Sequence, residues 1–347
     1  MPPNQKEHLL TEYDNYVKEK EADLNKKNNE SALSTRFTQQ PIIWLNTISI
    51  ILFHIVSIIS FFICVRQVYY LTIIWGFVVG IAAGFGVTAG AHRLWTHRAY
   101  KAKLPLQIIL LVLYSVAGMN SLYDWVRDHR VHHRYSETDA DPHNSKRGFF
   151  FSHVGWLMQK KHPDVIRKGA GVNMSDITDD PLLAFYNKHF QVFKILFCFI
   201  LPVIPPLYFW NEYWLYALGS QVFVRYMCIL NMTWSVNSFA HIWGQRPYDK
   251  RIRPAENIGV AIVALGEGWH NYHHVFPWDY KAAELGNYKF NFTTTLLDVF
   301  QKIGWVYDAK TPSAELVQNT INKYGDGSHI PEVPEEYANE SKIYHQE

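Results

Sequence analysis

The sequence predicts an all-α integral membrane protein in which four transmembrane helices carry a helical cap on the cytosolic side of the bilayer. Three observations predict this fold: four long apolar runs, an excess of positive charge on one side of them, and histidines gathered near their ends. Composition alone does not decide between fold classes. A chain of 347 residues that is 48% hydrophobic and 16% aromatic suits either two soluble domains or one small polytopic membrane protein.

The first two spans follow a polar N-terminal segment. Residues 1–40 are mixed in charge, carry no cleavable signal peptide, and are expected in the cytosol. Residues 41–65 are almost wholly apolar and long enough to cross a hydrocarbon core of about 30 Å. Residues 68–91 form a second uncharged run, rich in glycine, which lets helices pack closely in lipid. We therefore expect two spanning helices here.

The region between the second and third spans is mostly polar and charged. Its one apolar run, residues 104–119, is short and flanked by proline. A run of this length does not cross a bilayer comfortably. We expect it not to span, and to form a helix lying on the membrane surface.

The last two spans form a predicted helical hairpin. Residues 192–209 and 213–236 are apolar, and the polar pair Asn211-Glu212 separates them. Arg225 lies in the middle of the last run, where a charge is costly unless it faces the protein interior or the helix rises out of the bilayer there. We expect the second arrangement.

Charge sets the predicted orientation. The loop from Arg93 to Lys188 carries 14 Lys and Arg residues, against Arg66 alone in the two short loops on the other side. Positive loops stay in the cytosol, so both termini and the histidine-rich loop are expected there. Residues 308–347 form a polar C-terminal tail that is expected to be partly disordered. The formal charge of only +2 gives no basic stripe for nucleic acid, so no nucleic-acid partner is expected.

Nine of the 17 histidines fall in four short stretches. The stretches are His92-Arg-Leu-Trp-Thr-His97, His129-Arg-Val-His132-His133, Asn237-Ser-Phe-Ala-His241 and His270-Asn-Tyr-His273-His274. In each H-x-x-H-H, positions i, i+3 and i+4 share a helix face while the adjacent histidines diverge, so one helix can serve two metals. His92 and His97 would diverge on an unbroken α-helix, so either the helix bends or the ligands wrap around the metal pair. Asn237 shares a face with His241, where its amide could hold a metal-bound water.

The type and number of ligands favour iron. Imidazoles suit iron, copper or zinc, but zinc rarely takes more than four ligands, and nine histidines over two centres give four to five each. A soluble carboxylate di-iron site needs two Glu-x-x-His motifs, and only Glu267-Gly-Trp-His270 is present. Beside Glu137 and the two aspartates that follow it, His143 stands where carboxylates could orient ligand imidazoles, although a plain acidic turn is an equally good interpretation. An oxygen-activating metal pair beside a membrane favours a lipid chain as substrate.

From about residue 44 to 329, the sequence closely resembles the membrane fatty acyl-CoA desaturases of the stearoyl-CoA type, particularly the insect members. The segments that carry the resemblance are Gly86-Val-Thr-Ala-Gly-Ala-His-Arg-Leu-Trp-Thr-His97, Arg127-Asp-His-Arg-Val-His-His133, Glu137-Thr-Asp-Ala-Asp-Pro-His-Asn144, Arg147-Gly-Phe-Phe-Phe-Ser-His-Val-Gly-Trp156, Arg246-Pro-Tyr-Asp249 and Gly266-Glu-Gly-Trp-His-Asn-Tyr-His-His274. The resemblance implies a desaturase domain over residues 41–307 and two irons. It implies that one iron is held by His92, His97, His129, His133 and His273. It implies that the other is held by His132, His241, His270 and His274, with Asn237 reaching it through water.

The resemblance further implies oxygen-dependent insertion of a double bond, of delta-9 or delta-11 type, into an acyl-CoA in fatty acid or pheromone and hydrocarbon biosynthesis. It implies substrate contacts at Asn46, Asn120, Arg127, Asp128, Lys160, Lys161 and Trp234. O2 is the expected co-substrate, cytochrome b5 and its NADH reductase the expected electron donors, and the endoplasmic reticulum membrane the expected location. The sequence shows no flavin or haem motif of its own.

Three alternatives remain open on the sequence. One is a fatty acyl hydroxylase on the same di-iron scaffold. The second is a histidine-rich membrane metal transporter, although its histidines should lie inside spans. The third is a catalytically inactive binding protein. A further hypothesis concerns chain length: Gly80 and Gly84 lie one helix face back from His92 and leave room for a long acyl chain, unless they simply let two spans pack closely.

Overall fold

Two long apolar helices, joined by a short connection, begin the described part of the chain. The computed structural model describes residues 40–284 and 290–329; in it α2 spans Trp44–Gln67, α3 spans Tyr70–Phe85, and α3 continues into a π-helical segment, η1, at Gly86–Thr96. Most large apolar side chains of α2 point outward, and only 11% of its most apolar stretch is buried. A surface of this length and apolarity fits lipid rather than water.

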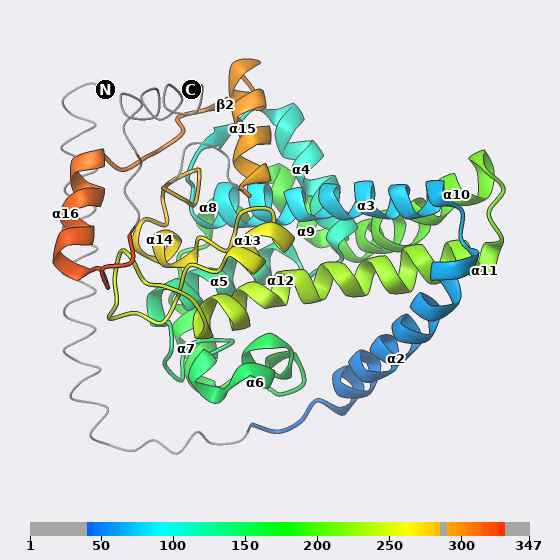
Figure 1. Ribbon diagram of the computed structural model, residues 1–347, viewed down its shortest axis with the longest axis horizontal. Coiled ribbons are helices and arrows are strands. Elements are labelled where there is room, and N and C mark those ends of the chain that lie inside the picture. Colours follow the sequence, from blue (N-terminus) through cyan, green and yellow to red (C-terminus); the bar gives the residue numbers. More distant parts are fainter. Residues whose placement is uncertain (1–39, 285–289, 330–347) are drawn as a thin grey trace, which may run out of the picture.

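Two further long helices run between the cap and the far end of the molecule. The first comprises α9 (Pro181–Lys194), η4 (Ile195–Ile200), η5 (Leu201–Val203) and α10 (Ile204–Phe209). The second comprises α11 (Trp214–Leu218), η6 (Gly219–Val224) and α12 (Arg225–Ile242). Figure 1 shows the α2–α3 and α10–α11 connections at the same end, on the right, with the cap at the other. This arrangement fits two hairpins that enter and leave from the cap side.

Within the described ranges, three helices are long and apolar enough to cross a membrane: Trp44–Gln67, Tyr70–Thr96 and Pro181–Phe209. They correspond to the predicted spans 41–65, 68–91 and 192–209, and the third begins earlier than predicted. The fourth predicted span, 213–236, falls on the continuous helix from Trp214 to Ile242. This helix does not belong to the three, because Gln221, Arg225 and Asn231 interrupt its apolar run. Four spans therefore stay a prediction.

The apolar run at residues 104–119 forms α4 (Leu104–Ala117), whose 14 residues would cover only about 21 Å. It is followed by α5 (Leu122–Tyr135), and the two helices are bent by 86° relative to each other. The pair would add a fourth candidate span only if both were counted as one. The Asp, Arg and His side chains of α5 argue against counting the pair as one span. On its own, α4 is too short to cross a bilayer, as expected.

Arg225 has the arrangement that was not expected. Its side chain is 5% exposed and faces the protein interior. The guanidinium donates to the carbonyls of Cys198 and Val116, and at 2.8 Å to that of Gln221. Cys198 and Gln221 lie in π-helical segments, where the regular hydrogen-bond ladder is interrupted and carbonyls become available. The helix can therefore keep this charge at membrane depth without rising out of the bilayer.

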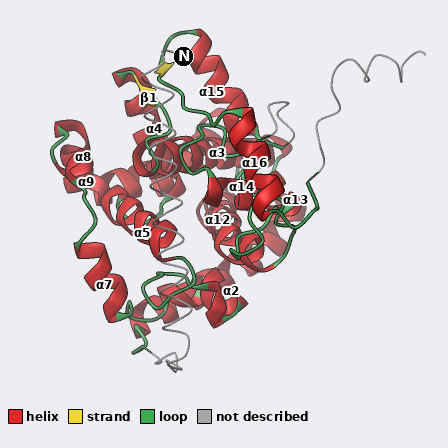
Figure 2. Ribbon diagram, turned by 90° about the vertical axis from the view of Figure 1, so that its left-hand side faces the viewer, coloured by secondary structure: helices red, strands yellow, loops and turns green. Residues whose placement is uncertain are grey.

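Short helices and loops build the cap, which Figure 2 shows nearly end-on. Its central helices are α5, the end of α12, and α14 (His270–Val275). Around them lie η2 (Ser145–Arg147), α6 (Phe149–His153), η3 (Gly155–Leu157), α7 (Pro163–Ala170), α8 (Ser175–Thr178), α13 (Ile258–Val263) and α15 (Phe292–Lys302). The core joins the cap to α3 and α4. Gly86 is needed here, because a Cβ would lie 2.3 Å from the backbone of Leu113.

The C-terminal tail, which was expected to be partly disordered, has a folded first part. A two-residue antiparallel pair, β1 (Lys101–Ala102) and β2 (Val306–Tyr307), brings residue 307 back beside the end of η1. Then α16 (Ala314–Tyr324) packs Val317 against Tyr248, Tyr272 and Phe276 of the cap. The overlooked sequence signal for α16 is an amphipathic helical pattern within an otherwise polar segment. Residues 330–347, and the N-terminal segment up to residue 39, lie outside the described residues.

Candidate metal centre

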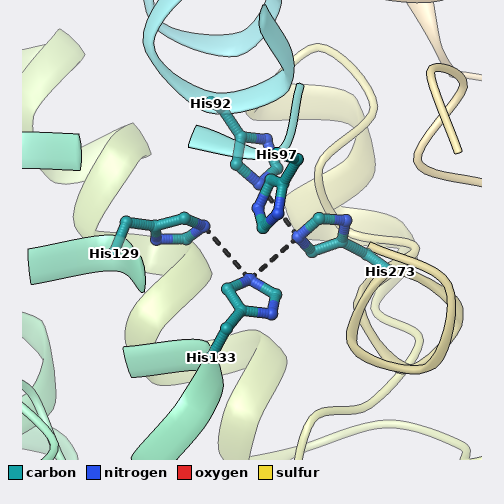
Figure 3. A group of neighbouring side chains, drawn as sticks. All are labelled: His92, His97, His129, His133 and His273. Carbon is teal, nitrogen blue, oxygen red and sulfur yellow. Dashed lines mark hydrogen bonds between the residues drawn. The ribbon is translucent and has the colours of Figure 1, made fainter. Parts of the chain in front are cut away.

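The first histidine group contains five imidazoles that converge on one point. Their potential ligand nitrogens all lie within 4.8 Å of one another, and the members are His92, His97, His129, His133 and His273. The Nε2 atoms of His92 and His133 lie 2.9 Å and 3.0 Å from Nε2 of His273. Figure 3 shows the five rings, which come from η1, its C-cap, α5 and α14, around a shared centre. Nitrogens that face each other across such a space are an arrangement that a cation stabilises.

The π-helical segment explains how His92 and His97 reach the same centre. The backbone N–H of His97 donates to the carbonyl of His92 at 3.1 Å, a bond between residues five apart. In a π turn, residues five apart are stacked above one another, as residues four apart are in an α-helix. The expectation of a bend or of ligands wrapped around the pair is therefore replaced by a local change of helix type.

The second histidine group lies beside the first and is more deeply buried. It comprises His132, His241, His270 and His274, and each of these residues is 1% exposed. Nε2 of His270 lies 2.9 Å from Nε2 of His241 and 3.1 Å from that of His274. The rings of His133 and His274, one from each group, stack at 4.2 Å between centroids. The two groups are thus direct neighbours.

The two H-x-x-H-H helices divide their histidines between the groups as their spacing predicts. On α5, His129 and His133 face the first group and His132 faces the second. On α14, His270 and His274 face the second group and His273 faces the first. Positions i and i+4 share a helix face while i+3 diverges enough to reach the neighbouring centre. The interpretation of one helix serving two centres is confirmed as geometry.

Three carboxylates hold the imidazoles from behind. Nδ1 of His132 lies 2.9 Å from Asp141, and Nδ1 of His241 lies 2.9 Å from Glu137. Nδ1 of His92 lies 2.7 Å from Glu267. An Nδ1–H that donates to a carboxylate leaves Nε2 with a free lone pair, and this fixes the tautomer that binds metal. The acidic turn that begins at Glu137 therefore orients histidines, rather than being a plain surface turn.

Glu267 is the partner that sequence reasoning missed. Besides His92, its carboxylate accepts from Arg93 at 2.7 Å, and Arg93 is 1% exposed. The guanidinium also donates to the carbonyl of Tyr280 and the hydroxyl of Thr294. A glutamate three residues before a ligand-like histidine was the available signal, but it was weighed only as part of a soluble di-iron motif.

Electrostatics match neutral imidazoles backed by ionised carboxylates. Burial lowers the pKa of His97, His129, His133, His241, His270, His273 and His274, and neighbouring imidazoles lower it further in every one of them. Burial alone would raise the pKa of Glu267, but Arg93 and His92 bring it down to about 2. Contacts with histidines likewise lower the pKa of Glu137 and Asp141 despite their burial. Deprotonated imidazoles are the form that coordinates metal.

A third set of residues flanks the second group. His143 lies with His132 and Asp141 close enough to share an ion, and its ring centroid is 4.2 Å from that of His132. His143 was the expected exception among the scattered histidines, and it is buried beside the site as anticipated. Of the others, His8 and His345 lie outside the described residues. His54 and His153 instead share the side chain of Asn231.

A cavity of about 940 Å³ leads from the histidines along α3. Near the histidines it is lined by Asn237, Trp234, Asn120 and Asp128, four of the residues singled out from the sequence, and by His92 and His270. Trp125 also lines it and stacks on His129 at 4.9 Å, a contact that the sequence did not reveal. Phe239 packs against Phe149 and Trp243, so it points away from the histidine groups.

The basic residues singled out from the sequence meet around Asp128. Lys161 and Arg127 both pair with its carboxylate, at 2.5 Å and 3.1 Å. Lys160 directly precedes Lys161 and is exposed, and its backbone N–H donates to the carbonyl of Pro41. The Asn46 side chain donates to the carbonyl of Leu157. These two hydrogen bonds hold the N-terminal end of α2 against the segment that contains Lys160 and Lys161.

Two glycines of α3 differ in their surroundings. A Cβ at Gly80 would meet nothing within 4 Å, and Gly80 lines the cavity. A Cβ at Gly84 would lie 2.7 Å from the Leu265 side chain. Close packing therefore accounts for Gly84, whereas at Gly80 the missing side chain leaves open space.

The chain is similar in sequence to known proteins over most of its length. The family model described as fatty acid desaturase matches residues 69–288. The chain is 52% identical over 291 residues to an acyl-CoA Delta-9 desaturase of Acheta domesticus, covering 84% of this chain and 81% of that one. It is 50% identical over 289 residues to an acyl-CoA Delta(11) desaturase of Spodoptera littoralis, covering 83% and 85%. It is 47% identical over 287 residues to a stearoyl-CoA desaturase of Sus scrofa, covering 83% and 79%.

Proposed function

The chain belongs to the fatty acid desaturase family, and from this premise we propose that it is an acyl-CoA desaturase whose two histidine groups each hold one iron. The observation that carries the proposal is the pair of adjacent histidine groups at the head of a long cavity. The chain is an oxidoreductase and a membrane protein.

We assign His92, His97, His129, His133 and His273 to one iron, and His132, His241, His270 and His274 to the other, with Asn237 reaching the second through water. The donor set fits. Every histidine of both groups offers an imidazole nitrogen, and burial lowers the pKa of His97, His129, His133, His241, His270, His273 and His274. Five nitrogens in one group exceed the four that zinc prefers, which supports iron. Bound irons would supply the activation of O2 by which two hydrogens leave adjacent acyl carbons.

The protein's own residues orient this chemistry. Glu267, Asp141 and Glu137 keep the Nδ1 protons of His92, His132 and His241 and hold the rings in position. The apolar cavity excludes water and lines up the chain, because the carbons of a saturated acyl chain are chemically alike and only position distinguishes them. The double-bond position, delta-9 or delta-11, would follow from how far the chain enters before it passes the histidines.

We place the CoA group at the cytosolic mouth, next to Arg127, Lys160 and Lys161. Guanidinium and ammonium groups pair with phosphates. Asp128, which holds Arg127 and Lys161 in place, lines the cavity and so joins the mouth to the tunnel. Asn46, Asn120 and Trp234 are the remaining proposed contacts with the substrate.

Topology and partners complete the proposal. We infer four spans, with both termini and the cap on the cytosolic face of the endoplasmic reticulum. The 14 positive charges between Arg93 and Lys188 support this orientation, as do the two short connections at the opposite end. Electrons would come from cytochrome b5 and its NADH reductase. The desaturase domain is proposed for residues 41–307, with α16 packed onto it.

The test is expression in desaturase-deficient yeast, with lipids measured by gas chromatography and mass spectrometry after derivatisation of double bonds. New unsaturated acyl chains should appear with the wild type and vanish with His270→Ala. The matched control is His189→Ala, because His189 lies outside both groups and should leave products unchanged. Hydroxylated chains would identify the oxygenase alternative. Unchanged lipids from a well-expressed, iron-loaded protein would reject the desaturase assignment.

A further inference from the structure

The far end of the cavity, away from the histidines, carries several polar side chains among its apolar ones. It is lined there by Cys64, Thr72, Ser220, Gln221 and Arg225. A tunnel that ended only on a hydrocarbon chain's methyl group would be expected to end in apolar side chains, because buried polar groups without partners are costly. Cys64, Thr72, Ser220 and Arg225 have hydrogen-bond partners within the protein, which leaves Gln221 to be explained.

Gln221 is the one whose hydrogen bonding is incomplete. Its residue is 1% exposed, and its Nε2 donates to the carbonyl of Thr72 at 3.1 Å. That carbonyl only accepts, so the amide nitrogen must face it and the orientation of the amide is fixed. Oε1 is buried without a hydrogen-bond partner among the described residues. A structural role in joining η6 to α3 explains the amide nitrogen, but it leaves the oxygen unexplained.

The local helix type fits a functional role. Gln221 lies in the π-helical segment η6, two residues after Gly219, where a Cβ would lie 3.0 Å from Cys64 Sγ. A π turn inserts a residue into the helix and re-aims the side chains beside it, and such turns are frequent at functional sites. Here the re-aimed residue lines the cavity.

A stripe of small residues connects the histidines with this polar end. Thr72, Gly76, Gly80, Gly84 and Thr88 recur every four residues before His92, and all six line the cavity. Residues four apart share one face of a helix, and each step covers about 6 Å. A Cβ at Gly80 would meet open space, and one at Gly76 would lie 3.3 Å from the Gln221 amide. Within this stripe, Gly76 and Gly80 keep the approach to Gln221 free of bulk.

Resting on the proposed desaturase function, we propose that Gln221 recognises a hydroxyl group at the terminal end of an acyl chain, so that ω-hydroxylated acyl-CoAs are a substrate class of this enzyme. Oε1 offers an acceptor, so the missing partner is a donor, and a chain that follows the stripe brings its terminal atom there. A neutral hydroxyl suits the site, because Arg225 already donates to three carbonyls. A single hydrogen bond of this kind strengthens binding by roughly fivefold.

The test compares ω-hydroxylated acyl-CoAs with unsubstituted acyl-CoAs of matched length, over a series of lengths. Equilibrium binding to the purified, iron-loaded full chain is measured by displacement of a labelled acyl-CoA, and turnover is measured separately. The wild type should bind the hydroxylated chain roughly fivefold more tightly at the length that reaches Gln221. Gln221→Leu keeps the size of the side chain but removes the acceptor, and should bring the ratio to about one.

A second variant guards against misfolding of the first. Gly80→Tyr leaves the Gln221 hydrogen bond intact but closes the path before it, and should also abolish the preference. A ratio near one in the wild type at every length would overturn the inference and indicate that water alone occupies the end of the cavity. A preference that persists in Gln221→Leu would overturn it too. Because binding is read without turnover, desaturation without discrimination refutes this inference alone, whereas discrimination without desaturation supports it and refutes the proposed reaction.

Discussion

Replacing Glu267 with glutamine tests how much the carboxylate behind the first histidine group contributes. The variant keeps the shape of the side chain but removes the negative charge that pairs with Arg93 at 2.7 Å and with His92 at 2.7 Å. Both partners are buried, so Arg93 is left as a buried cation without its counter-charge. Breaking a buried pair in this way costs about 3–5 kcal/mol. Loss of the partner behind a metal-bound histidine weakens metal affinity by about 10–100-fold.

The assay is iron per polypeptide after equilibration with chelators of graded strength, together with the temperature at which the detergent-solubilised protein inactivates. Glu267→Gln should lose iron at weaker chelators and inactivate at a lower temperature. The matched control is Glu256→Gln, also in the cap. Burial raises the pKa of Glu256 to about 8, so its carboxyl is mostly neutral at pH 7 and the substitution removes little charge. Iron retention and inactivation temperature equal to the wild type in Glu267→Gln, or an equal loss in both variants, would refute the reasoning.

Three further predictions concern the tunnel, the mouth and acid. Gly80→Tyr should shift products to shorter chains, because each methylene that no longer fits costs about 0.8 kcal/mol of binding. The control Val78→Tyr, on the exposed face of the same helix, should not shift them. An identical product profile for both variants would reject the tunnel role of Gly80. Lys161→Met should raise the KM for acyl-CoA severalfold with kcat retained, and a fall in kcat alone would contradict a role in CoA binding. Burial lowers the pKa of the histidines in both groups, so the unfolded chain takes up protons first as pH falls below about 6.5, and stability and iron retention should decline there. Chelator assays from pH 8 to pH 5 that show no change would contradict this.

The patterns that repeat along the chain were readable from the sequence. Apolar runs located three of the candidate spans, and the spacing of His129, His132 and His133 predicted how they divide between two centres. Both signals are local, because they depend on the geometry of one helix. The acidic turn at Glu137 was also recognised, since it stands next to a histidine in the sequence.

Contacts between distant segments were not readable in the same way. Glu267 meets Arg93 across 174 positions, and nothing in either segment specifies the partner. The environment of Arg225 depends on carbonyls freed by π turns, which hydropathy does not register. The folding of α16 depends on a cap surface formed by Tyr248, Tyr272 and Phe276. In each case the deciding term is a tertiary contact that a single segment does not encode.

The order in which the histidines emerge during synthesis has a consequence for biogenesis. His92, His97, His129 and His133 are made early, but the fifth member of their group, His273, and two of the four members of the other group, His270 and His274, come from α14, near the end of the chain. A ribosome-bound chain that has not yet reached residue 270 therefore has helices in the membrane but two incomplete sites. Metal uptake then becomes a late step that reports on a finished polypeptide. Prematurely terminated chains would stay metal-free, and an iron-dependent gain in protease resistance would distinguish complete molecules from truncated ones.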